Sequence, residues 1–387
     1  MKPVVVAGHV CLDLTPAWSA EPAIDAGRLI GVGPLAVSPG GCVGNTGPAL
    51  VALGVPTQLV ADVGSDELGR ILVELLAAST ADTAGIARLD GRATSYSIVV
   101  DYSGRDRTFW HHVGANAAFD GSGVVERIEA ARPAGSGGSA AGSGGNAGGA
   151  GEREVILHLG YSTHLPALYA DGGSELTRLV EAARAKGALI SLDMAEIDRP
   201  SDARAVDWEG LLARTLPAVD VMKASVDDLV AMMPRHAGLA PNEWAALLVD
   251  LGAAAGLVTA GPGGLYLRTG PERRIRTAAP TVRAAAADWS NRELWVPTLA
   301  TRVHVTTAAG DVAAAGFLAG LSGGHGPAEC ALLAAASAGA RISGRPIGDA
   351  YAIAAEFEPA SAARPHQPQG WTVGPDRVFH GPDDRAV

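Results

Sequence analysis

The residues with the clearest chemical potential lie at positions 305–311, where small residues precede a carboxylate at the start of an apolar helix. The amides of Ala308, Ala309 and Gly310 can point at an oxyanion, because the first amides of a helix lack carbonyl partners and the helix dipole favours negative charge there. Asp311 would face the same space and could accept a proton from an attacking hydroxyl. Taken alone, the segment fits an ordinary stabilising acidic residue in a first helical turn slightly better.

Polar side chains beside glycines recur at other predicted strand ends. Asp13 follows the first predicted strand, and a carboxylate that accepts two hydroxyl protons suits a polyol. Asn45 follows the pair Gly40 and Gly41, whose backbone can pass close to a ligand. Each feature alone has a generic alternative, a loop aspartate or a tight turn.

Strands and helices alternate through most of the chain and would position these side chains. Short apolar strands are expected at residues 3–8, 58–64, 155–160, 188–193, 219–224, 256–261 and 264–269. Helices are expected at residues 65–77, 174–186, 207–215, 226–233, 242–253, 311–321 and 327–341. This alternation predicts an α/β fold, with a mainly parallel central sheet flanked by helices. Residues 94–113 alternate apolar and polar around Ser103–Gly104, which predicts a hairpin, and the alanine-rich residues 278–293 predict a loop.

The overall composition excludes several classes of protein. The chain has 387 residues, with 30 Lys and Arg against 41 Asp and Glu, so its net charge of −11 argues against a nucleic-acid binder. The three cysteines are far apart, without zinc spacing, which favours a reducing cytoplasm over a disulfide framework. No apolar run is long enough to predict a membrane span. Residues 133–151 are almost entirely Gly, Ser and Ala, which predicts a flexible insertion.

The sequence Thr306-Thr-Ala-Ala-Gly-Asp311 resembles the C-terminal signature of the ribokinase-like (PfkB) carbohydrate kinases. The resemblance implies that Asp311 is the general base and that the amides of Ala308, Ala309 and Gly310 stabilise the transferred phosphoryl group. Val305 stands where potassium-activated members have an aspartate, which puts K⁺ activation in doubt.

Upstream segments resemble the sugar-binding half of the same family. The string Gly40-Gly41-Cys-Val-Gly-Asn45 is similar to its N-terminal signature. The resemblance implies that Asp13, Gly40, Gly41 and Asn45 contact the sugar, and that the 94–113 hairpin belongs to a small β-sheet lid. The resemblance also implies substrate contacts for Arg107, which precedes the second strand of the hairpin, and for Asn116, which follows the hairpin.

Downstream segments resemble the nucleotide site. The string from Lys223 through Ser225 to Asp228 is similar to the family's N-x-x-E motif, with Ser225 and Asp228 as replacements, so Asp228 would act on Mg²⁺ through water. A plain helix cap at Ser225 is a strong competing interpretation. The glycine loop that contains Thr259, Gly261 and Gly264 resembles the family's nucleotide loop.

The resemblance implies an ATP- and Mg²⁺-dependent kinase for a small sugar or sugar acid. A nucleoside kinase of the same family and a catalytically inactive sugar sensor remain as alternatives. The expected core comprises residues 1–8, 37–93 and 114–358, the lid residues 9–36 and 94–113, and the C-terminal tail residues 359–387. A homodimer that forms through the lid is a further expectation.

Overall fold

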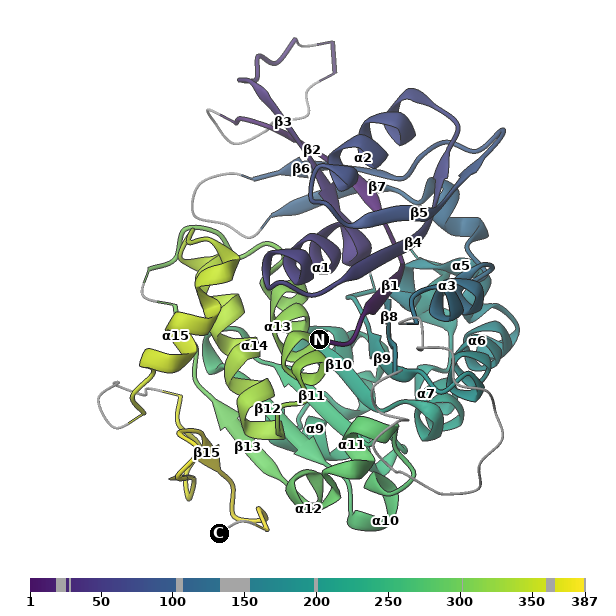
Figure 1. Cartoon of the computed structure of the whole chain (residues 1–387). Helices are drawn as coiled ribbons and strands as arrows, with labels where there is room; N and C mark the ends of the chain where they lie inside the picture. The colour runs from purple at the N-terminus through teal and green to yellow at the C-terminus, as the bar shows by residue number, and fades with distance from the viewer. Residues whose placement is uncertain are drawn as a thin grey trace.

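Apolar residues fill the strands of a large sheet whose two faces are both covered by helices. The computed structural model describes residues 1–18, 26–27, 29–101, 107–132, 154–197, 201–300, 302–359 and 366–385. The expected insertion at residues 133–151 lies outside them. The main sheet has eleven strands (Figure 1), which in spatial order are β14 (Thr372–Val373), β15 (Phe379–His380), β13 (Glu293–Val296), β12 (Leu265–Thr269), β11 (Ala255–Thr259), β10 (Val221–Ser225), β9 (Leu189–Asp193), β8 (Ile156–Gly160), β1 (Val4–Gly8), β4 (Thr57–Gly64) and β5 (Asp82–Leu89).

The strands from β11 to β5 are parallel to one another, and those from β12 to β14 are antiparallel. Parallel strands need covered faces because helical crossovers pack on both sides. Strand β1 shows this directly, since Val4 and Val6 join one hydrophobic cluster while Val5 and Ala7 join the other. The mainly parallel sheet between two helical layers is therefore confirmed.

The first cluster packs under helices α1 (Gly41–Ala52), α2 (Glu67–Ala77), α10 (Glu272–Ile275), α11 (Pro280–Ala284), α12 (Ala286–Trp289), α13 (Ala309–Gly323), α14 (Pro327–Ile342) and α15 (Ala350–Glu356). The second packs under α3 (Val124–Ala130), α5 (Pro166–Tyr169), α6 (Ser174–Ala185), α7 (Trp208–Thr215), α8 (Val226–Met232) and α9 (Pro241–Asp250). Short 3₁₀ turns complete the layers: η1 (Gly114–Ala118), η2 (Ser162–His164), η3 (Ala170–Gly173), η4 (Asp202–Ala205), η5 (Leu216–Ala218), η6 (Pro234–His236), η7 (Gly261–Gly263) and η8 (Ile347–Asp349).

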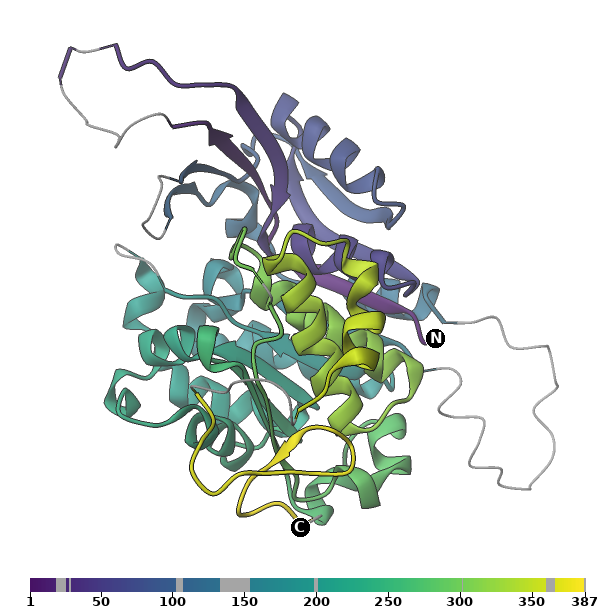
Figure 2. The ribbon, with the colours of Figure 1, turned by 90° about the vertical axis from the view of Figure 1, so that its left-hand side faces the viewer.

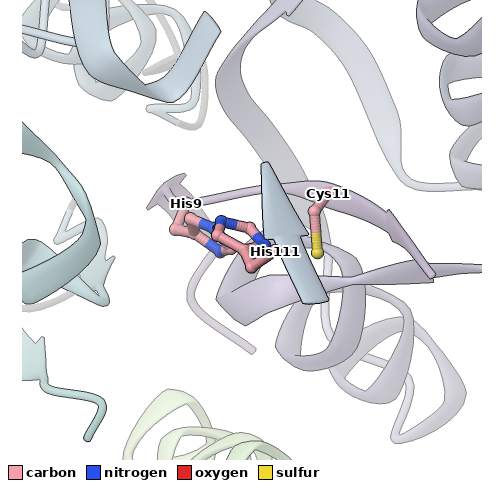
Figure 3. Close-up of side chains that lie close together, drawn as sticks. All are labelled: His9, Cys11 and His111. Carbon is pink, nitrogen blue, oxygen red and sulfur yellow. The ribbon is translucent and has the colours of Figure 1, made fainter. Parts of the chain in front are cut away.

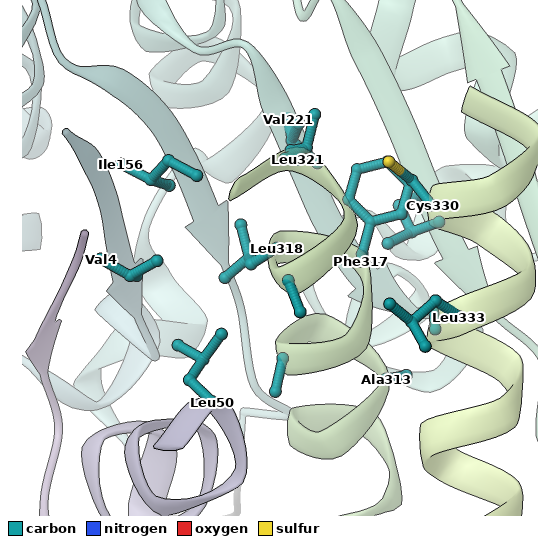
Figure 4. Packing of buried hydrophobic residues seen from close by; sticks show 14 of the residues in the cluster. Val4, Leu50, Ile156, Val221, Ala313, Phe317, Leu318, Leu321, Cys330 and Leu333 are labelled. Carbon is teal, nitrogen blue, oxygen red and sulfur yellow. The ribbon is translucent and has the colours of Figure 1, made fainter. Parts of the chain in front are cut away.

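Helices α13 and α14 pack side by side (Figure 4), with Phe317 of α13 beside Cys330 of α14. Glycine makes this approach possible, because a Cβ on Gly316 would lie 2.5 Å from the Leu333 carbonyl oxygen. A side chain there would push the helices apart and open a cavity in the core. The close packing holds the N-terminus of α13 in a fixed position.

A separate four-stranded sheet stands over the carboxyl end of the main sheet. Its order is β3 (Leu35–Gly40), β2 (Cys11–Pro16), β6 (Tyr96–Val100) and β7 (Thr108–His112). Strands β6 and β7 form the antiparallel hairpin predicted at residues 94–113, and β2 pairs in parallel with β6. Figure 2 shows β2 and β3 running outward from the main sheet. The expected small lid sheet is present, and β3 extends it to Gly40 rather than residue 36.

Two segments depart from the sequence-based predictions. Residues 278–293 contain α11 and α12 instead of a continuous loop. The expected C-terminal tail is part of the main sheet, since β15 pairs with β13 through Leu294 and Trp295. These pairings join residues more than eighty positions apart, so local pattern gives little sign of them.

Candidate active site

The carboxyl ends of the parallel strands bring polar side chains together above the main sheet. His9 follows β1, Tyr161 follows β8, and Asp193 ends β9. Ligands of open α/β sheets bind at this edge, because successive strand ends deliver loops to one place. Two adjoining cavities are present here.

The first cavity has a volume of about 410 Å³ and lies between the lid and the core. Its walls are formed by His9, Cys11, Asp13, Gly41, Asn45, Ser97, Arg107, Phe109, His111, Tyr161, His164, Ala195, Glu196, Thr306, Thr307, Ala308 and Asp311. Most are polar, and the aromatic rings add flat surfaces. The cavity can therefore offer both hydrogen bonds and stacking to a small polar ring.

The second cavity, of about 570 Å³, lies over strands β10 and β11. It is lined by Lys223, Ser225, Asp227, Asp228, Thr259, Gly261, Gly264, Ala309 and Gly310, together with apolar residues of α13 and α14. The two cavities share Tyr161, Ala195, Glu196 and Thr306. The N-terminus of α13 lies where they meet, because Asp311 faces the first and Gly310 the second.

Asp311 is buried at this junction, and both of its carboxylate oxygens accept hydrogen bonds. The Tyr161 hydroxyl donates to Oδ1 at 2.7 Å, and the Asn45 side-chain amide donates to Oδ2 at 2.9 Å. Burial raises the pKa of Asp311 to about 6, although Lys223 and the two hydrogen bonds oppose the rise. A carboxylate with that pKa is ionised at neutral pH and accepts a proton more readily than a surface aspartate.

The first turn of α13 differs in part from the anion hole expected of residues 308–310. Ala308 adopts a left-handed conformation, with φ 62° and ψ 10°, and the Ala309 amide donates to the Thr306 carbonyl at 3.2 Å. The amides of Gly310 and Asp311 belong to the first helical turn, where no carbonyl of the helix can accept from them. The geometry therefore favours Gly310 and Asp311 over Ala309 as donors to an anion.

A buried ammonium group lies beside this turn. The Lys223 Nζ lies 3.0 Å from Asp193 Oδ1, and a Cβ on Gly310 would stand 3.1 Å from Nζ. Burial alone would lower the pKa of Lys223, but the carboxylates of Asp193, Asp228 and Asp311 outweigh it and raise that pKa. Lys223 therefore carries a full positive charge at the boundary of the two cavities.

The residues predicted to bind sugar divide into lining residues and supporting residues. Asp13 and Asn45 line the first cavity, and burial raises the pKa of Asp13. Gly40 lies behind them, since a Cβ there would overlap Asp13 Oδ2 at 2.3 Å. Gly41 has φ +76°, and a Cβ on it would meet His9 Nδ1 at 2.4 Å.

Arg107 and Asn116 play different structural parts. Arg107 lines the first cavity and donates to Asp101 at 2.7 Å. Asn116 is fully buried, and its amide both accepts from the Val10 amide at 3.3 Å and donates to the Val10 carbonyl at 2.8 Å. The expectation that Asn116 contacts substrate is therefore corrected, because this side chain clamps the connection between β1 and β2.

The glycine loop after β11 lines the second cavity. Gly264 has φ +85°, and a Cβ on it would lie 2.3 Å from the Val296 carbonyl oxygen. Gly261 also has positive φ, at +51°. Only glycine fits the close approach at Gly264, so the loop keeps its backbone open to the cavity beside Thr259.

Ser225 and Asp228 form a reciprocal cap at the start of α8. The Ser225 hydroxyl accepts from the Asp228 amide at 3.0 Å, and Asp228 Oδ2 accepts from the Ser225 amide at 2.7 Å. The competing interpretation as a helix cap is thus present in the structure. Asp227 and Asp228 both line the second cavity as well, and oxygen ligands of this kind suit Mg²⁺.

Several lining residues were not among the sequence-based candidates. The Tyr161 hydroxyl contacts Asp311. The ring of His9 lies against the rings of Tyr161, His111 and His164. His111 lies on β7 beside Trp110, which is half exposed. Tyr161 directly follows strand β8, just as Asp193 ends the neighbouring strand β9. Its position after a predicted strand is the sequence signal that could have identified it as a site residue.

The fold and the paired cavities define a ribokinase-like protein. Residues 1–134 and 176–346 match the model of the pfkB family carbohydrate kinases. The chain belongs to this family, whose activity class is ATP-dependent phosphorylation of a carbohydrate, with Mg²⁺. No helix within the described residues is long and apolar enough to cross a membrane.

Solved structures share the fold at low sequence identity. A ribokinase of Arabidopsis thaliana complexed with ribose and ATP is 17% identical with a TM-score of 0.62, and covers 92% of this chain and 99% of its own. Phosphofructokinase-2 of Escherichia coli in complex with fructose-6-phosphate is 18% identical, with a TM-score of 0.62, at 92% and 98% coverage. A nucleoside kinase of Methanocaldococcus jannaschii is 16% identical, with a TM-score of 0.57, at 92% and 99% coverage.

Proposed function

We propose that this kinase transfers the γ-phosphoryl group of MgATP to a hydroxyl of a small sugar or sugar acid, with Asp311 as general base. The observation that carries the proposal is the position of Asp311, buried at the junction of the two cavities. An acceptor in the first cavity and a nucleotide in the second would meet at this carboxylate.

Asp311 can act as a base while Tyr161 and Asn45 hold it. A carboxylate offers about four lone-pair positions, so two remain after these hydrogen bonds. An acceptor hydroxyl can donate to one of them, and the fixed carboxylate then removes its proton as the new bond to phosphorus forms. Pre-positioning of this kind lowers the entropic cost of reaching the reactive geometry.

Charge on the transferred group is neutralised from the second cavity. The Gly310 amide and the Lys223 ammonium lie at the boundary, where the terminal phosphate of a nucleotide on the glycine loop would arrive. Mg²⁺, when bound with ATP, supplies a further positive charge on the phosphates. Asp227 and Asp228 would hold it, with Asp228 acting through water because one of its oxygens already caps α8.

The monovalent cation expected in some family members has weak support here. Val305 brings no side-chain oxygen, and its amide donates to the Ile342 carbonyl at 3.2 Å. We therefore propose that turnover does not depend on K⁺.

Cationic side chains favour an acidic sugar among the possible acceptors. Arg107 lines the first cavity, and Arg341 lies behind its wall, donating to the Thr307 carbonyl at 3.1 Å. Asp13, which lines the same cavity, would accept hydrogen bonds from the sugar hydroxyls. A nucleoside is the second candidate, because the rings of His9, Phe109 and Tyr161 could stack with a base.

The decisive experiment measures ADP release from MgATP with a panel of sugars, sugar acids and nucleosides. Asp311→Asn keeps the shape of the side chain and removes the base, so we expect a loss of about 10²–10⁴-fold in turnover. Asp349→Asn is the matched control, since Asp349 pairs with Arg345 on the surface. Equal turnover in Asp311→Asn would refute the assignment, and tight sugar binding without turnover would support a sensor.

The lid is also the proposed site of self-association. Leu35 and Val37 of β3 and Phe109 and Trp110 of β7 are exposed apolar residues on its strands. A homodimer would remove this apolar surface from water. Sedimentation equilibrium tests this, with Trp110→Lys expected to shift the protein toward monomer.

The three cysteines are free and buried, which suits the expected reducing cytoplasm.

A further inference from the structure

Three potential metal ligands lie close together (Figure 3), and all three line the first cavity. His9 follows β1, Cys11 begins β2, and His111 lies on β7 of the lid. One ligand atom from each residue lies within 4.8 Å of the other two. The proposed phosphoryl transfer uses none of these three side chains.

The spacing of the two imidazoles matches a metal site. The Nε2 atoms of His9 and His111 are 3.4 Å apart. Two nitrogens bound at about 2.0–2.1 Å to one tetrahedral zinc ion are separated by about 3.3–3.4 Å. Without metal, one ring can donate a proton to the other across this gap. A metal ion would replace that proton without moving the rings apart.

The surroundings hold both rings in place. The Nδ1 of His111 contacts the Ser97 hydroxyl at 3.1 Å, which fixes the ring and leaves Nε2 toward His9. His9 is buried, and the missing side chain of Gly41 makes room for its ring. Metal-bound histidines are usually oriented by such a hydrogen bond on the second nitrogen.

Cys11 needs a small movement to complete the set. Its sulfur lies 3.4 Å from Asp13 Oδ1 and 3.8 Å from the Ser97 hydroxyl. The sulfur must approach the nitrogens by roughly 1 Å to reach a zinc–sulfur distance of about 2.3 Å. On binding, the thiol would lose its proton to solvent and become a thiolate ligand.

We propose that His9, Cys11 and His111 form a binding site for a divalent ion of the zinc type, with its fourth position open to the first cavity. Two imidazoles and a thiolate select borderline-soft ions such as Zn²⁺ or Co²⁺, whereas Mg²⁺ prefers oxygen ligands. The Mg²⁺ that accompanies ATP would therefore not bind at this site.

The bound ion would compete with the sugar. Asp13 and Arg107 line the same cavity as the three ligands, so an ion and its fourth ligand would fill space that the acceptor needs. This consequence rests on the proposed function. The binding site itself does not, because it is defined by the three side chains.

The test uses Co²⁺ as a visible probe with the untagged full-length protein. We expect one equivalent to bind, with tetrahedral absorption bands and a thiolate-to-cobalt charge-transfer band. Cys11→Ser should remove the charge-transfer band, and His111→Gln should weaken binding at least tenfold. Cys330→Ser and His112→Gln are matched controls, since Cys330 packs between α13 and α14 and His112 lies outside the cavity lining; both should retain the spectrum.

Absence of stoichiometric binding, or a charge-transfer band that survives in Cys11→Ser, would overturn the proposal. Melting curves of each variant show whether it is folded. If Cys11→Ser is unfolded, the test uses the wild-type protein instead. Bound Zn²⁺ should then protect the Cys11 thiol from an alkylating reagent. The spectra need no turnover, so failure of the kinase assignment leaves this result separate. Displacement of Co²⁺ by an accepted sugar tests the competition.

Discussion

Removal of one hydroxyl group should change the pH dependence of this enzyme. In Tyr161→Phe, the hydrogen bond to Asp311 Oδ1 is lost, while the ring that stacks on His9 remains. This hydrogen bond favours the ionised carboxylate, so its loss favours protonation. The base should then need a higher pH to become ionised.

The size of the effect follows from the charge on the acceptor. A hydrogen bond to a charged group contributes about 1.5–3 kcal/mol, and 1.36 kcal/mol corresponds to one pH unit. The acidic midpoint of kcat/KM should lie near pH 6 in the wild type, where burial places the pKa of Asp311. Tyr161→Phe should move the midpoint upward by about one to two pH units.

The other charged groups around Asp311 set the sign of this profile. Lys223 favours the ionised form and Asp228 the protonated form. Asp193 pairs with Lys223. Activity should therefore rise with pH through the midpoint, as Asp311 loses its proton. At pH 7 the variant should lose roughly two- to tenfold in kcat/KM, and the two proteins should converge near pH 9.

The assay is ADP release at saturating MgATP and low acceptor concentration between pH 5 and pH 9. Tyr351→Phe is the matched control, because the Tyr351 hydroxyl donates to the Leu53 carbonyl at 3.0 Å, at the surface. A reduced plateau with an unshifted midpoint would refute the reasoning. Tyr161 would then act by shape alone.

Three further predictions concern the rest of the site. Lys223→Ala leaves the Asp193 carboxylate buried without its partner, so urea titration should show a loss of about 3–5 kcal/mol in the free energy of unfolding. Lys186→Ala, which breaks an exposed ion pair with Glu129, should change it little, and equal losses would contradict the argument. Gly264→Ala should weaken ATP binding at least tenfold by calorimetry, whereas Gly263→Ala, with Ala260 Cβ at 3.2 Å, should retain it; equal affinities would exclude a tight loop at Gly264. Deletion of residues 133–151 should leave turnover intact, and a large loss would show that the segment contributes to the site.

The sequence was most informative where function constrains a short segment. The start of α13, the glycine loop and the strand β11 before that loop were predicted from residue type and order, whereas β13, which precedes α13, was not. Parallel strands with both faces covered are almost wholly apolar, as in β1 and β8, and this pattern is easy to recognise. The family assignment rested on the same segments.

The parts that could not be predicted depend on contacts between distant residues. Asn116 follows the predicted hairpin and was expected to contact substrate, but its side-chain amide pairs with the backbone of Val10. Tyr161 adopts φ 61°, a left-handed conformation that nothing in its local sequence indicates. His111 could face either side of its strand, and only the register with β6 directs it into the cavity.

The pairing of β15 with β13 bears on how the protein is completed during synthesis. Asp384 lies 3.2 Å from the buried Arg292 and also accepts from the Glu293 amide at 2.8 Å. Strand β1, by contrast, is the third strand from the opposite edge of the sheet and is synthesised before both β13 and β15. Arg292 therefore gains its acidic partners, Asp376 and Asp384, only after the residues that form β14 and β15 have begun to emerge. Premature termination near residue 370 would release a chain with an exposed sheet edge and an uncompensated guanidinium, a natural target for quality-control proteases.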